Sequence, residues 1–190
     1  MKIGLFFGSF NPIHIGHLII ANYMANHSQL DKVWLMVSPQ NPLKDKNQLI
    51  QVYDRLEMAK LATENCENIE VKDDELKLPK PSYTVDTLAY LQEKYPAVEF
   101  VLIMGEDNLL SLPKWKNYEF ILKNYPIYVY PRPGVTQSAL SQHPNVTITQ
   151  TPVMEISSSF IRKAIQEGKN VQFFMPEKVL GFIESKGLYG

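Results

Sequence analysis

The sequence contains one cysteine, Cys66, and only four histidines among its 190 residues. A single cysteine excludes an internal disulfide framework and any metal site built from several cysteines, which fits a reducing compartment. An excess of charge is also lacking, because the formal net charge is −1. Without a basic surface, neither a nucleic acid nor a membrane is expected as the main partner, and a small ligand fits better.

No apolar run reaches the length of a membrane span, and the first residues, KIGLFF, follow no charged lead and precede no cleavage-type sequence. We therefore expect a cytoplasmic protein. With 45% hydrophobic residues the chain can bury a core of its own, and it shows no repeat, low-complexity tract or linker. A single domain over residues 1–190 is expected.

Short apolar runs alternate with helical patterns along the chain. Strands are expected over 3–7, 33–37, 69–71, 100–104, 127–130 and 146–149, and helices over 16–27, 53–65, 84–95, 108–125, 157–168 and 176–187. Serines and a proline open the last two helices, and Gly168 and Gly187 end them. Nearly continuous apolar strands that alternate with helices predict an α/β fold: a single-domain, Rossmann-like, doubly wound, mainly parallel sheet with helices on both faces.

The stretch GSFNPIHIGH, residues 8–17, lies where the first strand runs into a helix. Neither G-x-G-x-x-G nor G-x-x-x-x-G-K-[ST] occurs, so the common dinucleotide fingerprint and the P-loop are both absent. Gly8 and Ser9 can bring backbone N–H groups close to a ligand, and the N-terminus of the following helix favours anions. His14 and His17 are three residues apart, so both can face one oxyanion.

This histidine pair has two other interpretations. Each histidine could cap the turn or pack locally. His-x-x-His spacing can also hold zinc, but zinc sites use three or four ligands, and no Cys, Asp or Glu lies within ten residues of the pair. The glycines, the proline and both histidines together favour a phosphate-binding turn.

The stretch resembles the G-x-F-x-P-x-H-x-G-H signature of the nucleotidyltransferase superfamily. Other segments are similar to motifs of the bacterial nicotinate-mononucleotide adenylyltransferase family: SPQNPLK (38–44), SYTVDTL (82–88), MGEDNLLSLPKW (104–115), YPRPG (130–134) and ISSSFIR (156–162). The resemblance covers nearly the whole chain. It departs from the family pattern at Asn11, where many members have Asp, and at Leu43, where many have His.

The resemblance implies transfer of the adenylyl group of ATP to nicotinate mononucleotide, which gives the deamido dinucleotide and pyrophosphate in NAD biosynthesis. The attacking phosphate is already anionic at pH 7, so neither a general base nor a covalent intermediate is expected. Catalysis then consists of positioning and charge stabilisation. Mg²⁺ is expected to arrive with ATP, without a protein metal ligand. The sequence leaves open whether the chain forms a homo-oligomer.

The resemblance also assigns residues to ATP. His14 and His17 would donate to the α-phosphate, while Arg162 and Lys44 would hold the β- and γ-phosphates, with the C-terminal helices over 157–187 completing this site. The other residues expected to bind ATP are Gly8, Ser9, Phe10, Gly105, Asp107, Ile156, Ser157, Ser158 and Ser159. Alternatives are a surface ion pair for Arg162 and a helix N-cap for Asp107.

Trp115 is expected to stack on the nicotinate ring, because an N-ribosylated pyridinium is a cation that a tryptophan face attracts. Plain core packing is the alternative for Trp115, and it is the expected role of Trp34. The remaining residues expected at the mononucleotide, by resemblance, are Tyr83, Thr84, Lys116 and Arg132. The candidate donors to the nicotinate carboxylate, by the same resemblance, are Thr84, Tyr83 and the backbone N–H of Lys116.

Other functions were considered. Within the superfamily the alternatives are phosphopantetheine adenylyltransferase and cytidylyltransferase, which are typically shorter and lack SYTVDTL. A nucleotide-binding sensor that has lost activity is a third alternative, and the presence of His14, His17 and Arg162 argues against it.

Overall fold

Six parallel strands form one sheet in the computed structural model, which describes residues 1–39, 49–79 and 81–190. The strand order is β3-β2-β1-β4-β5-β6. The strands are β1 (Lys2–Gly8), β2 (Lys32–Val37), β3 (Ile69–Lys72), β4 (Glu99–Gly105), β5 (Ile127–Tyr130) and β6 (Val146–Ile148). Every strand run that the sequence predicts is present, and the Rossmann-like α/β class is confirmed.

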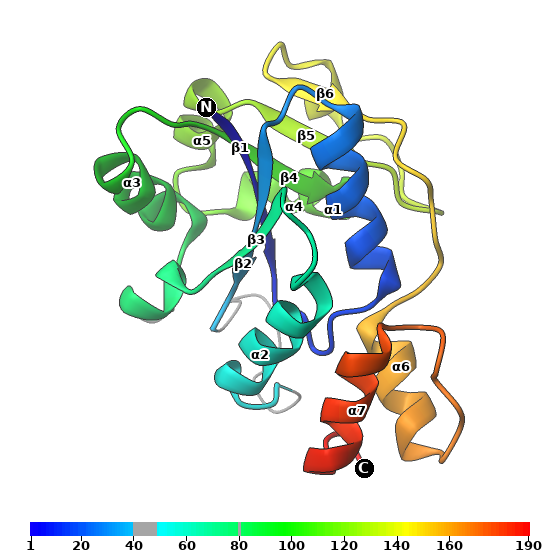
Figure 1. The fold of residues 1–190 in the computed structure, drawn as a ribbon. Helices are drawn as coiled ribbons and strands as arrows, with labels where there is room; N and C mark the ends of the chain where they lie inside the picture. Colours follow the sequence, from blue (N-terminus) through cyan, green and yellow to red (C-terminus); the bar gives the residue numbers. More distant parts are fainter. Residues whose placement is uncertain (40–48, 80) are drawn as a thin grey trace.

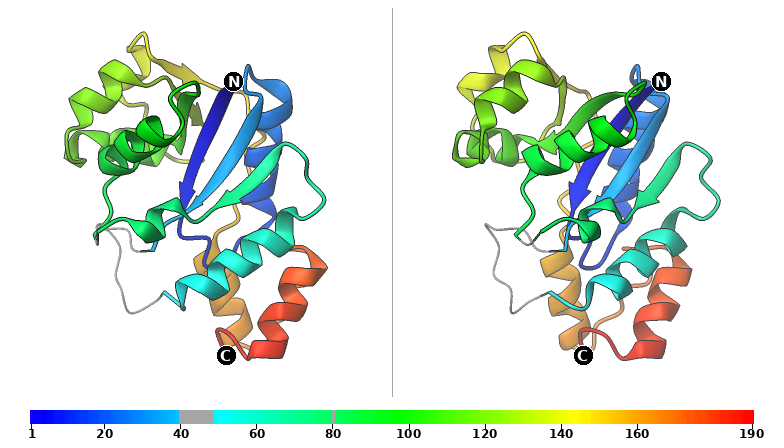
Figure 2. Two further views of the ribbon diagram at one scale, coloured as in Figure 1. Left: turned by 60° about the vertical axis from the view of Figure 1, so that its left-hand side comes forward. Right: turned by 90° about the vertical axis from the view of Figure 1, so that its left-hand side faces the viewer.

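Helices cover both faces of this sheet (Figures 1 and 2). One face carries α1, and the opposite face carries α3 and α5, while α2 lies beside the C-terminal pair α6 and α7. The helices are α1 (Ile15–His27), α2 (Val52–Thr63), α3 (Thr84–Lys94), α4 (Glu106–Ser111), α5 (Tyr118–Asn124), α6 (Ser158–Gln166) and α7 (Glu177–Lys186). Short 3-10 turns are η2 (Asp74–Lys77), η3 (Leu112–Lys114) and η4 (Ala139–Gln142).

Alternate residues of the strands enter two separate apolar cores. On β1, Phe6 packs into the core beneath α1, α2, α6 and α7, while Leu5 packs into the core beneath α3, α4 and α5. Leu35 and Trp34 divide in the same way on β2. Trp34 is thus a core residue, as expected. Because both faces of the sheet are buried, these strands read as continuous apolar runs in the sequence.

The strand order reverses direction between β1 and β4, which are neighbours in the sheet although β2 and β3 separate them in the chain. In open α/β sheets, the loops that leave the carboxyl ends of strands diverge at such a switch point and form a crevice for ligands. The GSFNPIHIGH turn follows β1, and Asp107 follows β4. The topology therefore brings these two sequence motifs to one edge.

The predicted helix over 108–125 is wrong as a continuous element. The structure divides this segment into α4, η3 and α5. Pro113 lies in the 3-10 turn, where its ring and missing N–H interrupt the helical hydrogen bonds. Asn117 adopts a left-handed conformation, with φ of 52°, immediately before α5. The break places Trp115 on an irregular segment between helices.

The C-terminal helices begin and end at the predicted signals. Ser157 is the N-cap of α6, and its hydroxyl accepts a hydrogen bond from the backbone N–H of Phe160. Pro176 precedes α7, and Gly168 and Gly187 have positive φ at the helix ends. Buried side chains of both helices join the core beneath α1, so the pair packs against the rest of the fold.

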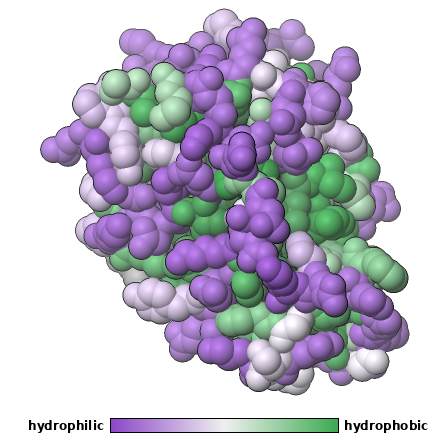
Figure 3. Space-filling view, in the orientation of Figure 1, coloured by the Kyte–Doolittle hydropathy of each residue, from purple (hydrophilic) through white to green (hydrophobic). Residues whose placement is uncertain are grey.

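On the face seen in Figure 1, apolar side chains gather over α1 and hydrophilic side chains surround them (Figure 3). Leu18 and Ile20 of α1 are only partly buried. Within residues 1–39, 49–79 and 81–190, no helix has both the length and the apolar character needed to cross a membrane.

Candidate active site

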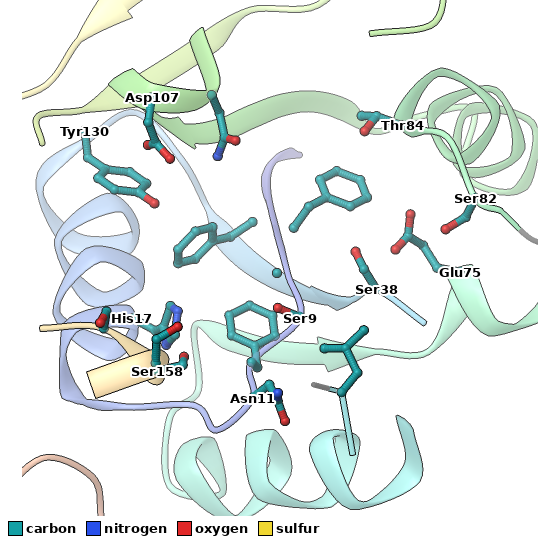
Figure 4. Close-up of a pocket in the computed structure, with 18 of the residues that line it drawn as sticks. Ser9, Asn11, His17, Ser38, Glu75, Ser82, Thr84, Asp107, Tyr130 and Ser158 are labelled. Carbon is teal, nitrogen blue, oxygen red and sulfur yellow. The ribbon is translucent and has the colours of Figure 1, made fainter. Parts of the chain in front are cut away.

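A cavity of about 480 Å³ opens at the carboxyl edge of the sheet. Its volume lies in the range of small-molecule sites. Side chains from the turn after β1, from the segment after β2 and from the loops leading to α3, α4 and α6 face a common space (Figure 4). The predicted residues that line it are Gly8, Ser9, Phe10, His14, His17, Tyr83, Thr84, Asp107, Trp115, Lys116, Arg132, Ile156, Ser157, Ser158, Ser159 and Arg162. Gly105 is not among the lining residues, and Lys44 lies outside the described residues.

One end of the cavity, the histidine end, is formed by His14, His17, Ser158 and Arg162. His14 is the N-cap of α1 and His17 lies in its first turn, so their rings stack with centroids 3.7 Å apart. The Nδ1 atom of His17 accepts a hydrogen bond of 3.2 Å from the backbone N–H of His14. Because Nδ1 is the acceptor, a neutral His17 carries its proton on Nε2, where the N–H can be donated.

His14 is buried, with 5% of its surface exposed. Burial, and to a lesser degree the positive charge of Arg132, lower the pKa of His14 from 6.5 to about 4. The ring is therefore neutral at pH 7 and offers a hydrogen-bond donor without a full charge. Its Nδ1 atom is buried and has no hydrogen-bond partner among the described residues.

The turn between β1 and α1 is closely packed. A Cβ atom on Gly8 would lie 2.7 Å from the ring of Phe10, which is 1% exposed, and one on Gly16 would lie 2.6 Å from Ile156. Phe10 itself has a positive φ of 44°. Packing thus explains why glycine occupies these positions, and the approach of a ligand to the backbone of Gly8 and Ser9 stays a prediction.

Helix α6 is fastened to this turn by side chains that donate to backbone carbonyls. The hydroxyl of Ser158 donates to the carbonyl of Pro12 at 2.9 Å. The guanidinium of Arg162 donates to the carbonyl of Asn11 at 2.8 Å and to the hydroxyl of Ser159 at 3.3 Å. Arg162 thus lies at the histidine end, which argues against a surface ion pair as its main role.

Asp107 and Arg132 form a wall of the cavity after β4 and β5. The Nε atom of Arg132 lies 3.5 Å from a carboxylate oxygen of Asp107, and its guanidinium lies over the ring of Tyr130. A Cβ atom on Gly105 would lie 2.5 Å from the Asp107 carboxylate, so glycine leaves room for this side chain. Gly105 is the N-cap of α4, and the N-cap interpretation of Asp107 is therefore wrong. Arg132 also lies close enough to His14 to lower its pKa.

The opposite end, the tryptophan end, is formed by Glu75, Tyr83, Thr84 and Trp115. Trp115 is half-buried against the core beneath α3 and also lines the cavity. Its expected stacking on the nicotinate ring stays a prediction. Its Nε1 atom is buried without a partner among the described residues. Thr84 is the first residue of α3, and a helix N-terminus at the cavity wall favours an anion.

Lys116 connects the segment that carries Trp115 to the start of α3. Its ammonium lies 2.9 Å from a carboxylate oxygen of Asp86 and 4.9 Å from the centroid of the Tyr83 ring. Both partners of the ion pair are about half exposed, so the pair adds little stability. The lysine charge is balanced by Asp86, which leaves the backbone N–H as the group to consider for ligand binding.

Sequence reasoning missed Arg55, which is 1% exposed beneath the cavity floor. Its guanidinium donates to the carbonyls of Ser9, Ser38 and Pro39 at 2.6, 2.8 and 3.0 Å. One buried cation therefore ties the turn after β1 to the segment after β2. One feature of the sequence could have indicated its burial. Arg55 stands four residues before Ala59, so both residues lie on the buried face of α2.

Glu75, in η2, was also missed and lines the cavity with 3% of its surface exposed. Its Oε1 atom accepts a hydrogen bond of 3.0 Å from the hydroxyl of Thr87. Its Oε2 atom is buried without a partner among the described residues. Burial raises the pKa of this carboxyl group, while Ser38 and Thr87 partly counter the shift.

The part of the chain that the structure describes holds no group of three or more His, Cys, Asp or Glu side chains arranged to bind a metal ion. The two carboxylates that line the described cavity are engaged with neighbours. Asp107 lies against Arg132, and Glu75 accepts from Thr87. These side chains do not form a carboxylate cluster of the kind that holds Mg²⁺ by itself.

Comparison with known proteins gave consistent matches along the chain. The cytidylyltransferase-like family model matches residues 5–164. A probable nicotinate-nucleotide adenylyltransferase of Flavobacterium psychrophilum is 54% identical, with 100% of this chain and 99% of the relative covered. The protein of the same description from Flavobacterium johnsoniae is also 54% identical, over 100% of this chain and 99% of the relative.

Among solved structures, a nicotinic acid mononucleotide adenylyltransferase of Plasmodium falciparum complexed with NaAD aligns with a TM-score of 0.83. The alignment covers 99% of this chain and 97% of the other, at 19% identity. At this identity the likeness concerns the fold alone.

Proposed function

The chain belongs to the nicotinate-nucleotide adenylyltransferase family of nucleotidyltransferases, and from this membership we propose that it transfers the adenylyl group of ATP to nicotinate mononucleotide. The products are nicotinate adenine dinucleotide and pyrophosphate. This activity is a step of NAD biosynthesis. One cavity with two chemically different ends suits a reaction that joins two nucleotides.

The reaction is a direct displacement at the α-phosphorus of ATP. An oxygen of the mononucleotide phosphate forms the new bond to this phosphorus, and the bond to the oxygen bridging the α- and β-phosphates breaks. Pyrophosphate leaves with the electron pair. Because the nucleophile is already an anion, the protein has to align the reactants and stabilise charge, and it needs neither a general base nor a covalent intermediate.

The histidine end supplies the stabilisation. Nε2–H of His17 and the neutral ring of His14 donate to the α-phosphate oxygens, and the guanidinium of Arg162 attracts the β- and γ-phosphates. Ser158 and Arg162 donate to the carbonyls of Pro12 and Asn11, so α6 and the histidine turn hold a fixed arrangement. Fixed donors that require no reorganisation are the most effective form of charge stabilisation.

The tryptophan end binds the mononucleotide. Trp115 stacks on the cationic ring, and the start of α3 with the backbone N–H of Lys116 receives the nicotinate carboxylate. We assign Arg132 to the ATP side, since it lies against Asp107 and lowers the pKa of His14. This differs from the sequence-based expectation, which placed Arg132 at the mononucleotide.

Mg²⁺ would be brought to the site by ATP, bound to its phosphates. This ion keeps most of its water and commonly binds through substrate phosphates. When bound, it neutralises charge on the leaving pyrophosphate. Lys44 is proposed to assist Arg162 at the same phosphates.

The observation that carries this proposal is that one cavity joins the histidine turn and Arg162 to Thr84 and Trp115. The test incubates the protein with Mg-ATP and nicotinate mononucleotide and measures pyrophosphate and dinucleotide. We expect both products in equal amounts, and less of both when the amide mononucleotide replaces the acid. Tight ATP binding without turnover on either mononucleotide would support a nucleotide sensor instead.

A further inference from the structure

The carboxyl group of Glu75 is the least satisfied acid in the described wall of the cavity. One oxygen, Oε1, accepts from Thr87. The hydroxyl of Ser38 lies near enough to the carboxyl group to oppose the rise of its pKa, but Oε2 itself is buried and makes no hydrogen bond of normal geometry among the described residues. An acceptor that stays buried without a hydrogen bond costs free energy, so such a group in a native structure calls for a partner. Figure 4 shows Glu75 facing the cavity beside Ser38 and Ser82.

The position of Glu75 indicates which substrate would supply that partner. Thr87, which holds Oε1, lies one turn along α3 from Thr84, and Thr84 is at the tryptophan end. Ser38, the other neighbour of the carboxyl group, follows β2. Glu75 therefore belongs with the elements that bind the mononucleotide.

The chemistry of a carboxyl group restricts the partner further. The phosphate and the nicotinate carboxylate are anions without a donor at neutral pH, so they would be repelled by an ionised Glu75 and cannot donate to it. The ribose hydroxyls are donors, and acidic side chains commonly recognise ribose through them. Oε2 can accept such a bond both as a carboxylate oxygen and as the carbonyl oxygen of the protonated acid.

We propose that Glu75 is a specificity-determining residue whose Oε2 atom accepts a hydrogen bond from a ribose hydroxyl of the mononucleotide. The inference rests on the proposed function, because it assigns a partner within the same cavity. Through this hydrogen bond the enzyme would select the ribonucleotide over its deoxy analogues. A buried acceptor that loses its donor keeps the desolvation cost, so a substrate without the hydroxyl is discriminated against strongly.

The experiment measures steady-state kinetics of wild type and Glu75→Met with nicotinate mononucleotide and with its 2′-deoxy and 3′-deoxy analogues. For wild type, we expect one deoxy analogue to have a KM about tenfold or more above that of the ribonucleotide. In Glu75→Met, which keeps the length of the side chain but has no oxygen to accept the bond, that ratio should fall to about twofold, while the KM for ATP stays unchanged. The coupling between the hydroxyl and the side chain is what a double-mutant cycle isolates.

Two controls separate binding from a structural role. Thr87→Val removes the bond to Oε1 but leaves Oε2 in the cavity, so the deoxy ratio should stay at the wild-type value. Asp74→Asn changes the adjacent buried acid, which pairs with Lys94 at 2.6 Å and does not line the cavity. It should also leave the ratio unchanged.

The inference is overturned if wild type shows no penalty for either deoxy analogue, if the penalty is the same in Glu75→Met, or if Thr87→Val removes it equally. Failure of the proposed function is distinguishable, because wild type would then form no pyrophosphate from ATP and the ribonucleotide.

Discussion

The two ends of the cavity are built in different ways. The histidine end is held by side chains that donate to backbone carbonyls far away in the sequence, as Arg162 does to Asn11 and Ser158 does to Pro12. At the tryptophan end, the side-chain contact between the Trp115 segment and α3 is the half-exposed ion pair of Lys116 with Asp86, which adds little stability. The histidine end therefore has fixed donors that are suited to charge stabilisation. The tryptophan end is less tightly held and offers a surface for binding a ligand. Changes at the histidine end should therefore lower kcat, and changes at the tryptophan end should raise KM.

The largest effect is expected from a residue that serves both ends. Arg55→Met leaves the carbonyls of Ser9, Ser38 and Pro39 without their buried donor. A fourth bond, from Nε to the carbonyl of Ile50, is lost as well. We expect the free energy of unfolding to fall by about 4 kcal/mol, at roughly 1 kcal/mol for each of the four bonds. Urea denaturation measures the change. A variant as stable as wild type would show that the guanidinium is not the connection between the two loops.

The next effect is the pH dependence of stability that His14 imposes. Its pKa is about 4 in the folded protein and 6.5 as the reference for the unfolded chain, so the unfolded state binds the proton more readily. Stability is therefore complete above pH 6.5 and declines as the pH falls towards 4. The loss at pH 4 and below approaches about 3 kcal/mol.

Urea denaturation at intervals from pH 7 to pH 4 measures this decline, and His14→Gln should flatten it because the amide does not titrate. Equal slopes for wild type and His14→Gln would mean that the His14 ring is not kept neutral at the histidine end.

His17→Ala should lower kcat about 100-fold or more, since it removes a donor that acts on charge in the transition state. The KM for the mononucleotide should change little. His27→Ala is the control, because His27 is exposed at the far end of α1. Near-normal kcat in His17→Ala would remove His17 from catalysis and would blur the distinction between the two ends.

Trp115→Ala should raise the KM for the mononucleotide about tenfold, through loss of stacking on the cationic ring. The kcat value should stay within about threefold of wild type, and Trp115→Phe should restore part of the affinity. An unchanged KM would mean that Trp115 acts only in the core beneath α3.

The sequence predicted the fold more completely than the site. Continuous apolar strands and clear helix caps, such as Ser157, identified the α/β class and most elements. The break between α4 and α5 was not predicted, because a left-handed Asn117 has no distinctive pattern and the helix expected over 108–125 ran across Pro113. Local sequence patterns report only on residues that are neighbours in the chain. The break depends on the folded structure, where it places Trp115 on an irregular segment between helices.

For the site, motif resemblance identified residues that line one cavity, but it could not identify buried charges outside the motifs. Arg55 lies in a helix, where an arginine side chain is usually exposed to solvent. Glu75 lies in the charged run KDDELK, and such a run predicts an exposed segment. Their burial depends on contacts with segments distant in the chain, namely the turn after β1 for Arg55 and α3 for Glu75. Only the assembled fold reveals such contacts.

The central claim is a single direct displacement between two substrates held at opposite ends of one cavity. The stereochemical course at phosphorus tests it most directly, with ATP that carries a chiral thiophosphate at the α-position and nicotinate mononucleotide as acceptor. The configuration at the α-phosphorus of the dinucleotide is then determined. One in-line attack predicts inversion, and retention would contradict the account because it requires a second displacement through a covalent intermediate.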